Sequence, residues 1–232
     1  IINADFSYHI TDYVKNQNKI IFKIDDNKSK IVSNSIDFNQ LSSDFDSFKL
    51  PKNKKIVLTV ARFHPNKGYL NNLEIIIPLL KERDDFIYVY AGDTTKYPEL
   101  HNEFVKILDE NKVSEKVFAL GKISNVFELM QNSHFLLHFA NHEGFGLILL
   151  ESIRAKLPII TTNVGGIPEV LENTEFSPFD LNNINGAREK CREYLDNNRT
   201  HNFKQNYNDF LSLFTHRNRA KNIEKIIRKC VV

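Results

Sequence analysis

Apolar residues fall into short continuous runs from about residue 54 onward, and each run is followed by a longer stretch with helical spacing. The runs are rich in β-branched residues and do not alternate with polar ones, a pattern typical of strands buried on both faces of a sheet. They predict strands over residues 56–60, 86–91, 116–120, 134–140 and 158–162.

The stretches between these runs predict helices over residues 69–82, 99–111, 125–131 and 146–155. Strands and helices that alternate at this spacing form right-handed βαβ units around a parallel sheet. We therefore expect an α/β fold with a Rossmann-like, doubly wound sheet. Such sheets bind ligands beyond the carboxyl ends of their strands, so the loops after the strands are the places to look for chemistry.

The two ends of the chain have other patterns. Residues 20–24 (IIFKI) and 30–37 (KIVSNSID) each predict a short strand, and residues 42–55 (SSDFDSFKLPKNKK) resemble a polar linker. Beyond Asp180 the pattern turns helical, over residues 182–197, 202–214 and 217–229. We divide the chain into residues 1–52, 53–180 and 181–232.

Composition narrows the class of protein. Of the 232 residues 41% are hydrophobic, enough for a core, and the net charge of +2 gives no reason to expect nucleic acid as a partner. Cys191 and Cys230 lack the spacing of a metal site and are expected to be free thiols in a reducing compartment. Without a membrane-length apolar run or a signal-like start, we expect a cytoplasmic protein, and Ile1 in place of methionine suggests a fragment.

The loop after the first strand of the predicted sheet, residues 61–68 (ARFHPNKG), carries Arg62 and Lys67. A guanidinium offers a planar fork of donors and an ammonium a mobile point charge, and together they suit a diphosphate. A solvated basic loop is the alternative interpretation.

Residues 141–158 (NHEGFGLILLESIRAKLP) contain Glu143 and Glu151, with Gly144 and Gly146 after the first glutamate. The glycines allow a tight turn and a close approach of a ligand to the backbone. A helix that starts near Gly146 would aim its free N–H groups at the crevice, which favours an anion.

The spacing of the two glutamates argues against a close carboxylate pair. On one helix, residues eight apart lie about 80° out of phase and about 12 Å apart along the axis. They would hold different parts of one long ligand. Alternatively, Glu143 only complements the helix dipole and Glu151 lies on the surface. Against that alternative, Glu151 follows four apolar residues, so its carboxylate would need a partner.

Residues 161–172 (TTNVGGIPEVLE) end a strand, turn at Gly165 and Gly166, and open a helix at Pro168. An ordinary strand-to-helix turn explains this stretch taken alone. The order RFHPNKG, FALGKIS, EGFGLILLE and LPIITTNVGGIPEVLE, however, resembles the C-terminal half of a family 4 retaining glycosyltransferase with the GT-B fold. The glutamates match the E-x7-E motif of that family, and the likeness runs from about Lys30 to Glu172 and weakly beyond.

The resemblance implies a division of labour along the chain. Residues 1–52 would be the tail of an acceptor domain plus the interdomain linker, residues 53–180 the nucleotide-sugar-binding domain, and residues 181–232 helices that complete it. The implied roles are diphosphate binding for Arg62 and Lys67, sugar contacts for Glu143, backbone contacts to sugar and phosphates from Gly144, Phe145, Gly146 and Leu147, ribose binding for Glu151, and a border to the base from Lys122 and Ile123.

The implied reaction, in polysaccharide biosynthesis, moves a sugar from a UDP-, GDP- or ADP-sugar to a glycan or lipid-linked acceptor without a metal. The donor is a substrate, and no cofactor is expected. Two cations and a helix N-terminus would stabilise the charge on the departing diphosphate. Two other functions remain open, namely a nucleotide-sugar-binding subunit that needs a partner chain and a nucleotide-sugar epimerase of the same fold.

Several residues have weaker interpretations. The acidic pair of Asp44 and Asp46 is expected to be solvated rather than a metal site. His138 and His142 flank a strand end, where His142 either touches the donor site or is structural. The segment 217–229 is basic and amphipathic, so it either packs on the fold or makes a peripheral contact with an anionic membrane.

Three positions depart from the family pattern. Ala61 and Ser35 each replace a usual glycine, and so does Lys156 at a helix end, where a left-handed conformation would cost lysine roughly 1 kcal/mol.

Overall fold

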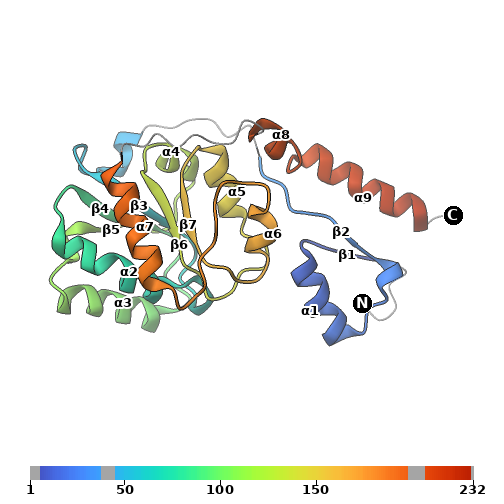
Figure 1. Cartoon of the computed structure of the whole chain (residues 1–232), viewed down its shortest axis with the longest axis horizontal. Helices are drawn as coiled ribbons and strands as arrows, with labels where there is room; N and C mark the ends of the chain where they lie inside the picture. The colour runs from blue at the N-terminus through green and yellow to red at the C-terminus, as the bar shows by residue number, and fades with distance from the viewer. Residues whose placement is uncertain (1–5, 38–44, 198–206, 231–232) are drawn as a thin grey trace.

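The centre of the molecule is a parallel sheet of five strands in the order β5-β4-β3-β6-β7 (Figure 1). The computed structural model describes residues 6–37, 45–197 and 207–230. The strands are β3 (Lys55–Val60), β4 (Phe86–Ala91), β5 (Val117–Ala119), β6 (Phe135–His138) and β7 (Ile159–Thr161). All five predicted strands are confirmed, and so is the α/β, doubly wound fold class.

Helices cover both faces of this sheet, because each strand presents apolar side chains to both sides. On β3, Ile56 and Leu58 belong to one core and Val57 to the other. The first core receives α4 (Val126–Gln131), α5 (Leu147–Arg154) and α6 (Ile167–Leu171). The second receives α2 (Tyr69–Glu82), α3 (Pro98–Glu110) and α7 (Ile184–Asp196). The helices predicted in this region are confirmed, with ends that differ by one or two residues.

The order of the strands fixes where a ligand would bind. The chain runs from β3 outward through β4 to β5, and then returns to place β6 on the other side of β3. The strands β3 and β6 therefore form the topological switch point, where the loops at the carboxyl ends diverge and leave a crevice.

The N-terminal segment forms a separate unit beside this sheet (Figure 1). The strands β1 (Ser7–His9) and β2 (Ser29–Ile31) pair in parallel, and α1 (Asp12–Phe22) connects them. After α8 (Tyr207–Ser212), α9 (His216–Cys230) runs on the same side of the molecule as this unit. The segment that follows β2 meets the segment between α8 and α9, where the Ile36 amide donates to the Phe214 carbonyl at 3.0 Å.

The last helix is confirmed as a helix, and two of its apolar residues, Ile223 and Ile226, are half-buried while Ile227 is exposed. No helix in the described ranges is long and apolar enough to cross a membrane.

The prediction of a strand over residues 20–24 is wrong, because Ile20 to Phe22 form the last turn of α1. The Thr11 side chain caps this helix by accepting from the Val14 amide at 3.2 Å, and Lys23 ends it with a left-handed φ of 51°. Ile20 and Ile21 remain 76% and 65% exposed. β-branched residues favour a strand only where a neighbouring strand pairs with them, and here local capping decides.

Two further sequence predictions can be compared with the backbone. The strand predicted over residues 30–37 is confirmed only at its start, in β2, and the preceding strand β1 was missed. Lys156 does adopt a left-handed conformation, with φ of 52°, so this helix end carries the strain expected for a non-glycine residue.

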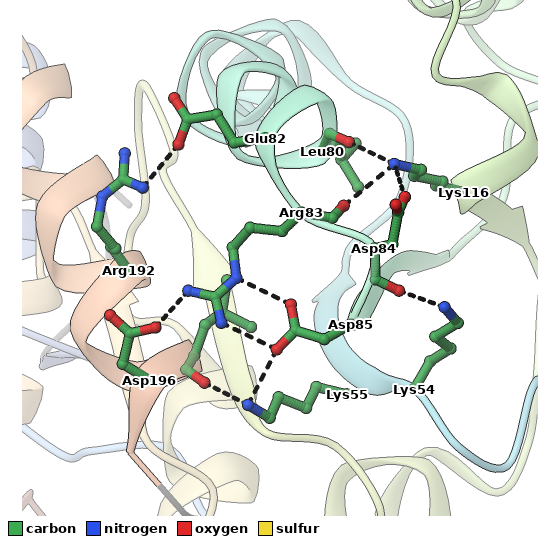
Figure 2. A network of polar contacts seen from close by, with 11 residues as sticks. Lys54, Lys55, Leu80, Glu82, Arg83, Asp84, Asp85, Lys116, Arg192 and Asp196 are labelled. Atoms are coloured by element: carbon green, nitrogen blue, oxygen red, sulfur yellow. Dashed lines mark hydrogen bonds and ion pairs between the residues drawn. The ribbon is translucent and has the colours of Figure 1, made fainter.

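A network of ion pairs ties the opposite, amino-terminal edge of the sheet together (Figure 2). Arg83 donates to both carboxylate oxygens of Asp85, at 2.8 and 2.9 Å, and also to Asp196 at the end of α7. Lys55, the first residue of β3, bonds to Asp85 and to the Leu195 carbonyl. The network therefore fastens α7 to the starts of β3 and β4, far from the carboxyl ends.

The pKa of the Asp85 carboxyl lies well below its ordinary value, because the bidentate hydrogen bond from Arg83 and a further bond from Lys55 outweigh partial burial. A lowered native pKa stabilises the fold at pH values above the pKa of an unfolded aspartate, about 4. This contribution is lost as the pH falls from about 4 toward the native pKa.

We expect Arg83→Met to lower the free energy of unfolding at pH 7 by about 1–2 kcal/mol, the worth of a bidentate but partly exposed pair. The deficit should shrink as the pH falls below about 4, because the unfolded chain is then protonated in both proteins. Urea unfolding at a series of pH values measures both effects. The control is Arg192→Met, which removes a pair with Glu82 and should cost much less, because both of these side chains are solvent-exposed. Equal losses of unfolding free energy in the two variants would contradict the larger contribution that we assign to the pair of Arg83 and Asp85.

Candidate functional site

Two adjoining pockets open at the carboxyl ends of the strands, and both include Val60 and Ala61 at the end of β3. We name each pocket after the strand that neighbours β3 on that side, β4 or β6. The β4-side pocket is lined by Val60, Ala61, Arg62, Ala91, Gly92, Asp93, Lys122, Ile123 and Val126. The β6-side pocket is lined by Ile10, Asn34, Val60, Ala61, Lys67, His138, Glu143, Gly144, Phe145, Gly146, Leu147 and Ile148.

The loop 61–68 divides its two cations between the pockets. Arg62 is exposed at the β4-side pocket, and Lys67 lies in the β6-side pocket. The loop contains a short 3-10 turn over Pro65–Lys67, capped by the His64 side chain, which accepts from the Asn66 amide at 3.1 Å. Gly68 follows with φ of 64°, and a Cβ there would lie 1.8 Å from the Phe139 carbonyl oxygen. Only glycine allows this contact, which draws Lys67 toward the loop after β6.

Lys67 and Glu143 form an ion pair across the mouth of the β6-side pocket, with Lys67 Nζ at 2.6 Å from Glu143 Oε2. His138 Nε2 lies 3.4 Å from the same oxygen. Burial alone would raise the pKa of the Glu143 carboxyl, but the hydrogen bonds from His138 and Lys67 lower it to about 2. Glu143 is therefore a carboxylate at every physiological pH.

The Gly-Phe-Gly stretch turns the chain from β6 into α5. Gly146 has φ of 88°, and α5 begins at Leu147 without a side-chain cap, so its first amides are available to an anion. The Phe145 side chain is buried and lies in the core, with its ring 6.2 Å from that of Phe214. Only the backbone of Phe145 can therefore meet a ligand. Leu147 is partly exposed at the rim.

Glu151 lies farther along α5 and is not among the residues that line either pocket. Its side chain is half-buried, and burial raises the pKa of its carboxyl while nearby Arg154 opposes that rise. Within the described ranges, its carboxylate accepts no hydrogen bond. Its proposed contact with a ribose therefore stays a prediction.

The N-terminal unit contacts residues 139–146, the loop between β6 and α5 that carries Glu143 and that we call the glutamate loop. The residues that make these contacts were not predicted from the sequence. The Thr11 hydroxyl donates to the Gly144 carbonyl at 2.9 Å. Glu169, on α6, accepts from the amides of Asp12 and Tyr13 at 2.7 Å each, and so caps the start of α1. These long-range contacts place Ile10 in the β6-side pocket. No local pattern marks them, and none marks Asn34 as part of the same pocket.

Among residues 6–37, 45–197 and 207–230, no group of three or more His, Cys, Asp or Glu is placed to hold a metal ion. Of the acidic pair, Asp44 lies outside the described residues, and Asp46 pairs with Lys52 at 2.9 Å.

The loop with Gly165 and Gly166 packs against the backbone of the glutamate loop. The Gly166 amide donates to the Glu143 carbonyl at 2.9 Å. A Cβ on Gly165 would lie 1.8 Å from that carbonyl oxygen, and one on Gly166 would lie 2.3 Å from the Gly144 carbonyl oxygen. The paired glycines thus do more than turn the chain, because their lack of side chains allows the backbone beneath Glu143 to pack closely.

We expect Gly165→Ala to displace the glutamate loop and to lower the unfolding midpoint by several degrees, because its Cβ would meet backbone atoms. Gly121→Ala is the matched control, since Gly121 has a similar φ of 63° against 59° but open space around it. The control should show only the strain of a left-handed alanine, about 1 kcal/mol. Thermal unfolding of both variants measures the two midpoints. Equal shifts of the midpoint would show that crowding of the Glu143 backbone by the added Cβ does not destabilise the fold.

Comparison with known proteins identifies the family. Residues 42–210 match the family described as glycosyl transferases group 1. The chain is 32% identical over 127 residues, 54% of its length and 27% of the relative, to the phosphatidylinositol N-acetylglucosaminyltransferase GPI3 subunit of Saccharomyces cerevisiae. The chain spans about a quarter of the length of that relative.

Solved structures share the fold. A glycosyltransferase from Rickettsia africae superposes with a TM-score of 0.82 at 20% identity, over 99% of this chain and 64% of that one. Anabaena HepE in complex with UDP-glucose superposes with a TM-score of 0.76 at 16% identity, over 97% and 64%. Since the family match spans most of the chain and the fold agrees, the chain belongs to the group 1 glycosyl transferases.

Proposed function

We propose that this chain is the donor-binding part of a retaining glycosyltransferase, which moves a sugar from a nucleotide-sugar to a glycan or lipid-linked acceptor. The observation that carries the proposal is the pair of pockets that meet at the end of β3, with a cation at each and Glu143 in one. A nucleotide-sugar is a long molecule with a base, a diphosphate and a sugar, and two joined pockets match such a shape.

In this proposal the base occupies the β4-side pocket and the sugar occupies the β6-side pocket. Ile123 and Val126 offer an apolar wall to a base, with Lys122 beside it. The sugar would lie against Glu143 and the backbone of residues 144–147. Glu151 is proposed to bind the ribose through its carboxylate, which burial leaves in need of a hydrogen-bond donor.

The diphosphate would lie between the pockets, near Lys67 and Arg62 and in front of the first amides of α5. An ammonium carries three N–H donors. Lys67 donates one of them to Glu143, so the other two can donate to phosphate oxygens. Sugar transfer leaves a nucleoside diphosphate, and these groups would stabilise its growing charge without a metal. Removal of one such group typically costs about 10²–10³ in rate.

Two relatives support the choice of substrate class. The Anabaena structure holds UDP-glucose, and the yeast relative is named as an N-acetylglucosaminyltransferase subunit. A UDP-sugar is therefore the first donor to test, ahead of GDP- and ADP-sugars. The word subunit in the yeast name also favours a second candidate, in which this chain binds the donor and a partner chain supplies the acceptor site.

Calorimetry of the chain with UDP, GDP and ADP tests the proposal. We expect one nucleotide to bind, and Lys67→Met to weaken that binding at least tenfold, since a charge-assisted contact is worth about 1.5–3 kcal/mol. The control is Lys106→Met, which removes an equally charged but exposed residue of α3 and should leave the affinity unchanged. Binding of none of the three nucleotides, or equal binding by both variants, would overturn the proposal.

A further inference from the structure

His138, the last residue of β6, is a buried polar side chain that the roles above leave unexplained. It is 1% exposed, and it lines the β6-side pocket with Lys67 and Glu143. Its carbonyl accepts from the Thr161 hydroxyl at 2.8 Å, which fixes the backbone at the strand end. A buried imidazole is costly unless its nitrogens are used, so the residue invites a functional explanation.

Among the described residues, the ring makes one hydrogen bond, to the carboxylate of Glu143. His138 Nε2 and Lys67 Nζ approach the same atom, Oε2, at 3.4 and 2.6 Å. Among the residues that the structure describes, no group donates to Oε1. The two donors thus hold one oxygen of Glu143 and leave the other to accept a bond from a ligand.

The surroundings also select which ring nitrogen donates. A carboxylate can only accept, so Nε2 must carry a hydrogen. Nδ1 is buried and has no partner in the described part of the chain. A ring that carries a hydrogen on Nε2 fits the contact with the carboxylate.

We propose that His138 is a positioning residue, whose ring donates from Nε2 to Glu143 Oε2 and so presents Oε1 to a hydroxyl of the donor sugar. The proposal rests on the proposed function for the identity of the ligand. It gives His138 a task that Lys67 cannot perform alone. Lys67 has a flexible side chain and donors to share with phosphate, whereas the ring is rigid and buried.

A first test needs no ligand. Nitrogen-15 NMR of the imidazole in the wild-type chain at pH 7 distinguishes the two neutral tautomers and the cation. We expect a hydrogen on Nε2, in the neutral ring or in the cation. The neutral tautomer protonated only at Nδ1 would turn a lone pair toward the carboxylate and overturn the proposal.

A second test separates positioning from packing. Calorimetry with UDP and UDP-glucose gives the ratio of the two affinities, which reports the contribution of the sugar. His138→Leu should reduce this ratio about tenfold, the worth of a charge-assisted contact, and leave UDP binding within about twofold of wild type. His138→Gln can still donate to Oε2 and should keep most of the ratio.

The outcomes are distinguishable. Equal losses for UDP and UDP-glucose in His138→Leu would assign the residue to packing, and an unchanged ratio would deny any role toward the sugar, so either result overturns the proposal. If the wild-type chain binds neither compound, the proposed function fails instead, and the NMR result alone decides whether His138 holds Glu143. Thermal unfolding shows whether each variant is folded.

Discussion

The close contact between the loop after β3 and the loop after β6 is the constraint on which the site depends. The Asn66 carbonyl accepts from the amides of Asn141 and His142, at 2.9 and 3.1 Å. Gly68 packs its backbone directly on Phe139. These bonds join two segments that lie more than seventy residues apart, and they bring Lys67 within reach of Glu143. The switch in strand order makes the meeting possible, because β3 and β6 are neighbours in space only.

Electrostatics then gives this contact its chemical character. Glu143 is buried enough that its carboxylate would be protonated more readily than usual, yet two donors on one oxygen reverse that tendency. Glu151, on the same helix-loop unit, is half-buried, no donor among the described residues reaches its carboxylate, and its pKa is raised. Two glutamates eight positions apart therefore differ in character because their surroundings differ, which agrees with separate roles rather than a shared proton.

The sequence predicts the sheet, most of its helices and the loops that carry the cations, because each depends on residues that are neighbours in the chain. Continuous apolar runs predict β3 to β7 without any information about contacts with distant parts of the chain. Residues 20–24 were assigned wrongly because their β-branched character was considered without the cap at Thr11. Ile10, Asn34 and the bond from His138 to Glu143 could not be predicted, since they depend on which distant loops meet.

The N-terminal unit shows how such distant contacts can matter. Glu169 binds the first amides of α1 with both carboxylate oxygens, and Thr11 bonds to the loop that follows Glu143. The side of the β6-side pocket that contains Ile10 therefore depends on a segment outside the five-stranded sheet. A movement of this unit would break a helix cap and change the pocket at the same time. The geometry thus couples the placement of the N-terminal unit to the end of the site where the sugar is proposed to bind.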